Sequence, residues 1–105
     1  MTYAVFLTAE AQEDLERLFD FVLERELACE GGRFELAAEA LDAIKAGLKV
    51  LQRFPFTCRK ATDSPFLREL IIPFGATGYV ALFEIVDDKT VVAGAVRHQR
   101  EDDYH

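Results

Sequence analysis

The sequence lacks an excess of positive charge and any long apolar run. Twelve lysines and arginines stand against nineteen aspartates and glutamates, which gives a formal net charge of −7. Because an acidic chain repels phosphate backbones at long range, we expect no direct non-specific nucleic-acid binding, although a local basic pocket is compatible with this charge. The apolar run Tyr3–Leu7 is far too short for a signal peptide or a membrane span, so we expect a soluble, cytoplasmic protein with no membrane partner.

Cysteine is also scarce, and the usual signatures of cofactor chemistry are missing. Cys29 and Cys58 are the two cysteines, and their separation offers no metal-ligand spacing. A single disulfide is arithmetically available, but two free thiols in a reducing cytoplasm is the interpretation we favour. The sequence has no metal-binding cluster, glycine-rich phosphate loop or nucleophile elbow, and segment 75–78 predicts a hairpin turn. We therefore expect neither a metal nor another cofactor.

The length and apolar content predict one domain, residues 1–105. A chain of 105 residues leaves little room for two domains. Half of the residues are hydrophobic and nine are phenylalanine, which is enough apolar surface for one core. A domain of this size buries a smaller fraction of its surface than a large one, so we expect modest stability.

The first half of the chain predicts a strand followed by two helices. The run Tyr3–Leu7 carries few polar atoms and predicts a short strand buried on both faces. Thr8 is a good N-cap for a first helix, which ends at Gly31-Gly32. A second helix continues to Phe54-Pro55, and the short link predicts an antiparallel helical hairpin. The apolar stripes that should face the core are Leu15, Leu18, Phe19 and Val22, and then Phe34, Leu41, Ile44, Leu48 and Leu51.

The second half predicts a three-stranded antiparallel meander after an irregular loop over residues 55–66. The strands are expected at Leu67–Ile72, closed by Pro73 and Gly75, then at Tyr79–Val86, and after an Asp87-Asp88 turn at Thr90–Val96. Their short connections favour antiparallel pairing. With the helices packed on one face of this sheet, the fold class is α+β.

Three stretches of the sequence resemble the RelE/ParE toxin superfamily, and its ParE-like branch in particular. They are Ala-Gln-Glu-Asp-Leu at 11–15, Leu-Arg-Glu-Leu at 67–70 leading into Pro-Phe-Gly at 73–75 and Gly-Tyr at 78–79, and the closing stretch 96–104. The last two stretches occur in the order and spacing of the family. The resemblance covers nearly the whole chain, and the order of the expected elements is also that of the superfamily.

The resemblance implies the toxin of a type II toxin–antitoxin, or plasmid stabilisation, system, silenced by a cognate antitoxin protein. ParE-like members are known for poisoning DNA gyrase, and RelE-like members cleave messenger RNA on the ribosome; a fold alone cannot choose between these. We favour a gyrase inhibitor that acts by binding. The alternative is a ribosome-dependent mRNA endoribonuclease, which would need several cations and an acid–base group around one phosphate. The acidic chain offers no convincing lysine–arginine cluster of that kind.

Arg68 matches a position where the resemblance implies an arginine. Its guanidinium suits an anion or backbone contact in a shared pocket. A salt bridge, with Glu69 or with an acid on the first helix, is an equally good interpretation, and the sequence leaves both open.

Arg97 and His98 end the last expected strand, where neighbours point to opposite faces. Arg97 is a candidate for binding the target or the antitoxin. His98, with an unperturbed pKa of about 6.5, could serve as a general base, but a structural role is the one we favour.

Further candidates flank these positions. Arg100 and Tyr104 could extend the binding surface, together with Arg59 and Lys60. If the protein is a ribonuclease, the catalytic candidates are Arg68, His98 and Tyr104. A toxin made to be covered by an antitoxin should expose apolar surface, for which the candidates are Phe21, Phe54, Phe56 and Phe66. A homodimer and a toxin–antitoxin hetero-oligomer both fit these expectations.

Overall fold

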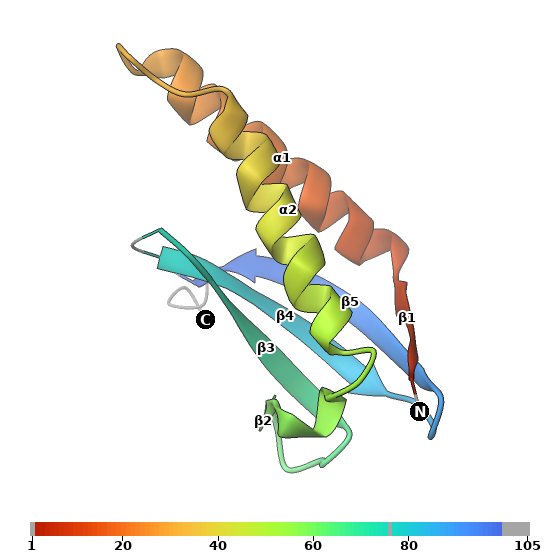
Figure 1. The fold of residues 1–105 in the computed structure, drawn as a ribbon. Coiled ribbons are helices and arrows are strands. Elements are labelled where there is room, and N and C mark those ends of the chain that lie inside the picture. Colours follow the sequence, from red (N-terminus) through yellow and green to blue (C-terminus); the bar gives the residue numbers. More distant parts are fainter. Residues whose placement is uncertain (1, 76, 100–105) are drawn as a thin grey trace.

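The computed structural model describes residues 2–75 and 77–99, and it places two helices against one five-stranded sheet (Figure 1). This arrangement confirms the α+β class and the helical hairpin. In chain order the elements are β1 Ala4–Leu7, α1 Ala9–Ala28, α2 Glu35–Val50, a 3-10 turn Pro55–Thr57, β2 Arg59–Lys60, β3 Leu67–Phe74, β4 Thr77–Ile85 and β5 Thr90–His98.

The strands lie in the order β1-β5-β4-β3-β2. Strands β3, β4 and β5 form the expected antiparallel meander. The two outer strands add to it on either side: β1 pairs with β5 in parallel, and β2 pairs with β3 in antiparallel. Strand β2 was not predicted from the sequence, because two residues within an irregular loop carry no periodic pattern.

Strand β1 is not buried on both faces, contrary to expectation. It is an edge strand whose side chains alternate between exposed and half-buried, and Phe6 is 57% exposed. Val5 and Leu7 point to the other side and pack against the core. An apolar residue on the open face of an edge strand interrupts the alternation that would reveal such a strand, so the sequence pattern was misleading here.

Pro73 does not close the expected strand Leu67–Ile72 either. It lies inside β3, which continues to Phe74, and it pairs with Gly78 of β4. Strand β2 covers only Arg68 and Glu69 of β3, so the outer edge of β3 around Pro73 has no partner strand among the described residues. Proline, which lacks an N–H, is tolerated at such an edge.

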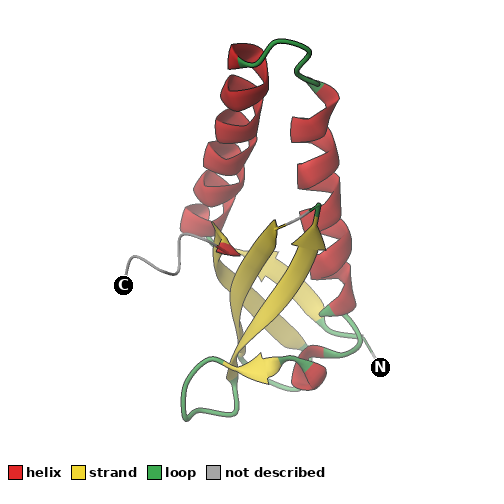
Figure 2. Ribbon diagram, turned by 90° about the vertical axis from the view of Figure 1, so that its left-hand side faces the viewer, coloured by secondary structure: helices red, strands yellow, loops and turns green. Residues whose placement is uncertain are grey.

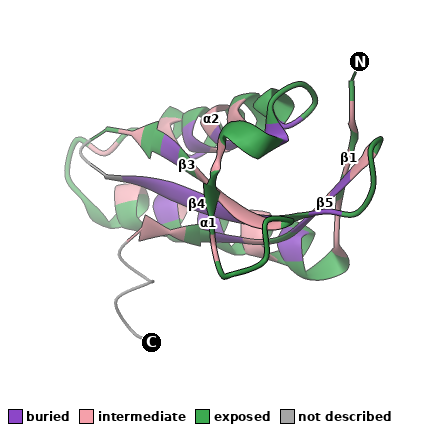
Figure 3. Cartoon of the chain, turned by 90° about the horizontal axis from the view of Figure 1, so that it is seen from below, coloured by how far each residue is buried: buried purple, intermediate pink, exposed green. Residues whose placement is uncertain are grey.

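The hairpin straddles the sheet, with α1 on β5 and α2 on β3 (Figure 2). Beyond the sheet the two helices project together and are joined through Gly31, whose φ of 75° belongs to the left-handed region. The core lies between the layers, and β4 is drawn largely buried in Figure 3. The largest fully buried side chains there include Phe83, Ile44, Leu51 and Val91.

The start of α1 closes an edge of the sheet. Thr8 is the N-cap, as expected, since its hydroxyl accepts from the backbone N–H of Ala11 at 3.1 Å. Strand β1 accompanies β5 only as far as Ala93. Past that point the backbone N–H of Val96 donates to Asp14 Oδ2 at 3.0 Å. A side chain of α1 thus takes the place of a neighbouring strand.

The two cysteines are free thiols, as expected: Cys29 is exposed and Cys58 is half-buried. Burial raises the pKa of the Cys58 thiol above its ordinary value. Within residues 2–75 and 77–99 no helix is long and apolar enough to cross a membrane.

Asp14→Ala should lower the free energy of unfolding by about 1–3 kcal/mol, because it removes a charged acceptor and leaves the partly buried Val96 N–H without a partner. Urea denaturation followed by circular dichroism measures this change. Asp20→Ala, an exposed aspartate of the same helix, serves as the control and should change stability by less than about 0.5 kcal/mol. Equal effects of the two substitutions would show that the Asp14 contact is unimportant.

Candidate functional site

Arg68 holds the loop that precedes β3. Its Nε donates to the carbonyl oxygen of Pro65 at 2.7 Å, and its Nη1 donates to those of Phe56 and Cys58 at 3.0 and 2.6 Å. The guanidinium also lies over the Phe56 ring, 5.2 Å from the centroid. The rigid fork of donors on arginine suits three carbonyl groups of one loop.

The ion-pair interpretation of Arg68 is therefore wrong. Glu69 forms its ion pair with Arg59 of β2, and among the described residues Arg68 makes no ion pair with an acid of α1. Arg68 instead ties the 3-10 turn and the loop to the sheet. The sequence allowed a backbone contact for Arg68, but it could not identify the carbonyl groups of the chain's own loop that accept, because every residue carries such a group.

Arg97 and His98 point to opposite faces of the sheet, as expected. His98 lies beside Tyr79 of β4 on the helix-covered face, with ring centroids 5.6 Å apart and the ring planes at 85°. Tyr79 is buried, and this burial raises the pKa of its hydroxyl. Arg97 pairs in register with Val80 and is exposed on the open face.

Arg68 and His98 lie too far apart to act on one phosphate. The partner of Arg68 on β4 is Phe83, whereas the partner of His98 on that strand is Tyr79. The separation of Tyr79 and Phe83 along β4 corresponds to roughly 13 Å at the usual rise of a strand, and β3 and β5 lie on opposite sides of β4. The structure thus does not bring these two catalytic candidates together.

The other candidates do not complete a cationic cluster within the described part of the chain. Arg59 and Lys60 are exposed on β2, at the far edge of the sheet from β1, and Arg59 is engaged with Glu69. Arg100 and Tyr104 lie outside the described residues.

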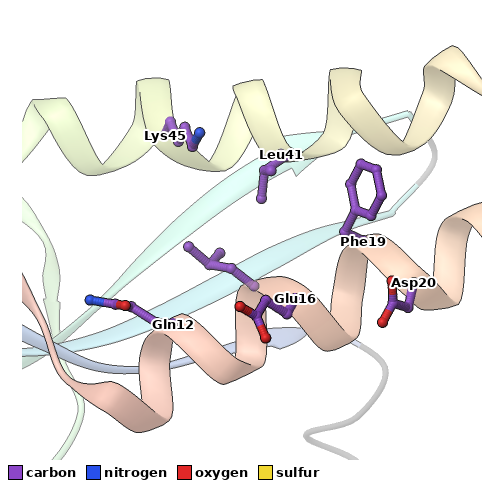
Figure 4. A pocket seen from close by; sticks show the side chains of 7 residues that line it. Gln12, Glu16, Phe19, Asp20, Leu41 and Lys45 are labelled. Carbon is purple, nitrogen blue, oxygen red and sulfur yellow. The ribbon is translucent and has the colours of Figure 1, made fainter.

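An apolar groove lies between the two helices of the hairpin (Figure 4). Its volume is about 510 Å³, and its apolar lining comes from Leu15 and Phe19 of α1 and Leu41 of α2. These three residues were expected in the core, but they are only half-buried. The apolar stripe of α1 is wider than the sheet can cover. Periodicity alone does not show which of its residues contact the sheet and which border the groove.

The groove continues towards β1. A second cavity of about 320 Å³ shares Leu15 and Lys45 with the first and adds Val5, Leu7 and Leu48. Together the two cavities form the interhelical groove, which runs from the middle of the hairpin to the edge strand. Glu16 and Asp20 on α1 and Lys45 on α2 give this groove acidic and basic sides. Such a groove suits an amphipathic segment of a partner.

Comparisons with known proteins agree with these features. The sequence profile described as the ParE toxin of type II toxin-antitoxin system, parDE, matches residues 5–103. Among solved structures, the "Chromosomal ParDE TA system from P. aeruginosa" is similar with a TM-score of 0.70 and 20% sequence identity, over 91% of this chain and 95% of that chain. Comparison with curated proteins gives no match. Because the profile matches almost the whole chain, this protein belongs to the ParE toxin family of type II toxin–antitoxin systems.

Proposed function

We propose that this ParE-family toxin inhibits DNA gyrase by binding to it, and that a cognate antitoxin neutralises the toxin by occupying the interhelical groove. The observation that carries the proposal is the family match over residues 5–103. The groove supports its second half, because it is largely apolar and continues from the middle of the hairpin to the edge strand β1.

The geometry favours binding over RNA cleavage by the chain itself. Three of the hydrogen bonds available to Arg68 are already made to its own loop, and His98 lies across β4 from it. Cleavage at one phosphate needs cations and an acid–base group within hydrogen-bond reach of the same atoms. The net charge of −7 also opposes docking on ribosomal RNA.

Among the described residues, Arg97 is the basic side chain that we expect to contact a large target. It is exposed on the sheet face opposite the helices. Within residues 2–75 and 77–99 its guanidinium forms no ion pair or hydrogen bond. An antitoxin in the interhelical groove would leave this face open. We therefore assign Arg97 to target binding and the groove to antitoxin binding.

Induction of the toxin without an antitoxin should stop growth through DNA damage. We expect induction of the DNA-damage response and gyrase-linked DNA breaks, with protein synthesis continuing during the first minutes. Pulse labelling of DNA and protein, together with recovery of covalent gyrase–DNA complexes, measures this. Early loss of translation with cut messages would instead establish the ribosome-dependent ribonuclease, and unchanged growth with soluble, folded toxin would contradict both.

Arg97→Ala and Arg68→Ala should both reduce toxicity, but for different reasons. Arg97→Ala removes an exposed charge, so stability should stay within about 0.5 kcal/mol of the parent. Arg68→Ala leaves three carbonyls without their donor and should lower the free energy of unfolding by about 1–3 kcal/mol. Growth assays paired with thermal denaturation separate the two effects. A fully toxic Arg97→Ala protein would remove Arg97 from the target-binding surface.

Leu41→Glu should weaken antitoxin binding at least about ten-fold, because it places a charge in the apolar part of the groove. Calorimetric titration of the purified toxin with its antitoxin measures the Kd. Val50→Glu is the matched control, since Val50 is an exposed apolar residue of the same helix outside the groove. An unchanged Kd for Leu41→Glu would place the antitoxin elsewhere.

A further inference from the structure

A separate pocket lies where four chain segments meet at the end of the sheet away from the hairpin link. Its volume is about 490 Å³. It is lined by Tyr3 just before β1, Phe56 of the 3-10 turn, Phe66 just before β3, and the end of β4 with the turn that follows it. It shares no residue with the interhelical groove.

The aromatic walls of this pocket are held in place yet open to solvent. Phe56 and Phe66 contact each other edge to face, with centroids 6.3 Å apart and ring planes at 73°. They remain 46% and 50% exposed. The Arg68 guanidinium lies over the Phe56 ring and is itself fixed by three carbonyl groups. The contact with Arg68, and not burial of the rings, therefore holds this part of the pocket in place.

All the charged residues that line the pocket are acidic. Glu84, Asp87 and Asp88 line it, and no lysine, arginine or histidine of the described chain does so. Asp87 accepts a hydrogen bond from the backbone N–H of Lys89 at 2.8 Å, and this bond lowers the pKa of its carboxyl. The Asp87 carboxylate is therefore ionised at neutral pH. Lys89 is the nearest basic residue in the sequence, and it lies outside the lining.

We propose that this pocket receives an arginine or lysine side chain, presented beside an apolar residue by a protein partner. The Arg68 guanidinium already lies over the Phe56 ring, so the ring of Phe66 is the aromatic surface that attracts a further guanidinium or ammonium group. Carboxylates at the rim add charge-assisted hydrogen bonds. The apolar surface of the same pocket accommodates the neighbouring side chain of the partner. This combination of aromatic walls and an acidic rim disfavours nucleic acid and acidic peptides, because both carry the wrong charge.

This proposal does not depend on the proposed function. The pocket shares no residue with the interhelical groove, and Arg97 does not line it. Its failure would leave the proposed function unchanged, and the reverse is also true.

The probe is the tripeptide acetyl-Leu-Arg-Leu-amide, titrated into the full-length, isotopically labelled protein and followed by NMR. The matched peptide carries citrulline in place of arginine, which keeps the shape and removes the charge. We expect the arginine peptide to shift the amide resonances of Ser64, Phe66 and residues 84–88 in a saturable way. The citrulline peptide should bind at least about two- to five-fold more weakly. Equal shifts with both peptides, or none at these residues with the arginine peptide, would overturn the inference.

Substitutions locate the interaction within the pocket. Phe66→Ala and Asp88→Asn should each raise the Kd of the arginine peptide about two- to five-fold. Phe54→Ala and Asp63→Asn are the controls, since both residues are exposed, belong to the neighbouring loop region and do not line the pocket. Controls that weaken binding as much as the pocket variants would show non-specific attraction and contradict the proposal.

A second copy of the chain is the other occupant to test. Light scattering at the titration concentration should show a monomer, in which the pocket is free for the peptide. A dimer that Phe66→Ala dissociates, and that the peptide cannot displace, would make the pocket a self-interface and overturn the proposal of a basic partner side chain.

Discussion

The packing of both helices against one face of the sheet, on either side of β4, is the constraint from which the surfaces of this toxin follow. The side chains of β4, among them Phe83 and Ala81, fill the space beneath the hairpin and are almost completely buried. Because α1 rests on β5 and α2 rests on β3, the helices cannot close over the groove between them. The same burial that stabilises the core therefore leaves Leu15, Phe19 and Leu41 open to a partner.

A second consequence concerns the face without helices. The helix-covered side uses Tyr79 and His98, whereas Arg97 is displayed on the other side of the same strand. The alternation of a strand thus separates a structural ring pair from an exposed cation. A toxin that must meet an antitoxin and a target can keep the two contacts on separate surfaces, which is how we divide the proposed roles.

Arg68 links stability to surface chemistry through backbone contacts within its own chain. By donating to the carbonyls of Phe56, Cys58 and Pro65, it gives an otherwise irregular segment a defined conformation. That segment supplies the short strand β2 and the Phe56 ring, which lines the pocket proposed to receive a basic side chain. A single guanidinium thus organises the end of the sheet opposite the hairpin link, and loss of its donors would affect both the loop and the pocket.

The sequence by itself determined the elements whose signals are local: the cap at Thr8, the hairpin link at the two glycines, and the strands of the meander, since hydrogen-bonding groups and periodicity act over a few residues. Its family motifs also sufficed to indicate the ParE toxin family. The tertiary structure was needed to establish that β1 is an edge strand parallel to β5, that Pro73 continues β3, and that Arg68 binds carbonyls of the loop preceding its own strand. It also decided that Leu41 lines a groove. These outcomes depend on which surfaces meet after the chain has folded, and residue identity along the chain does not encode that directly.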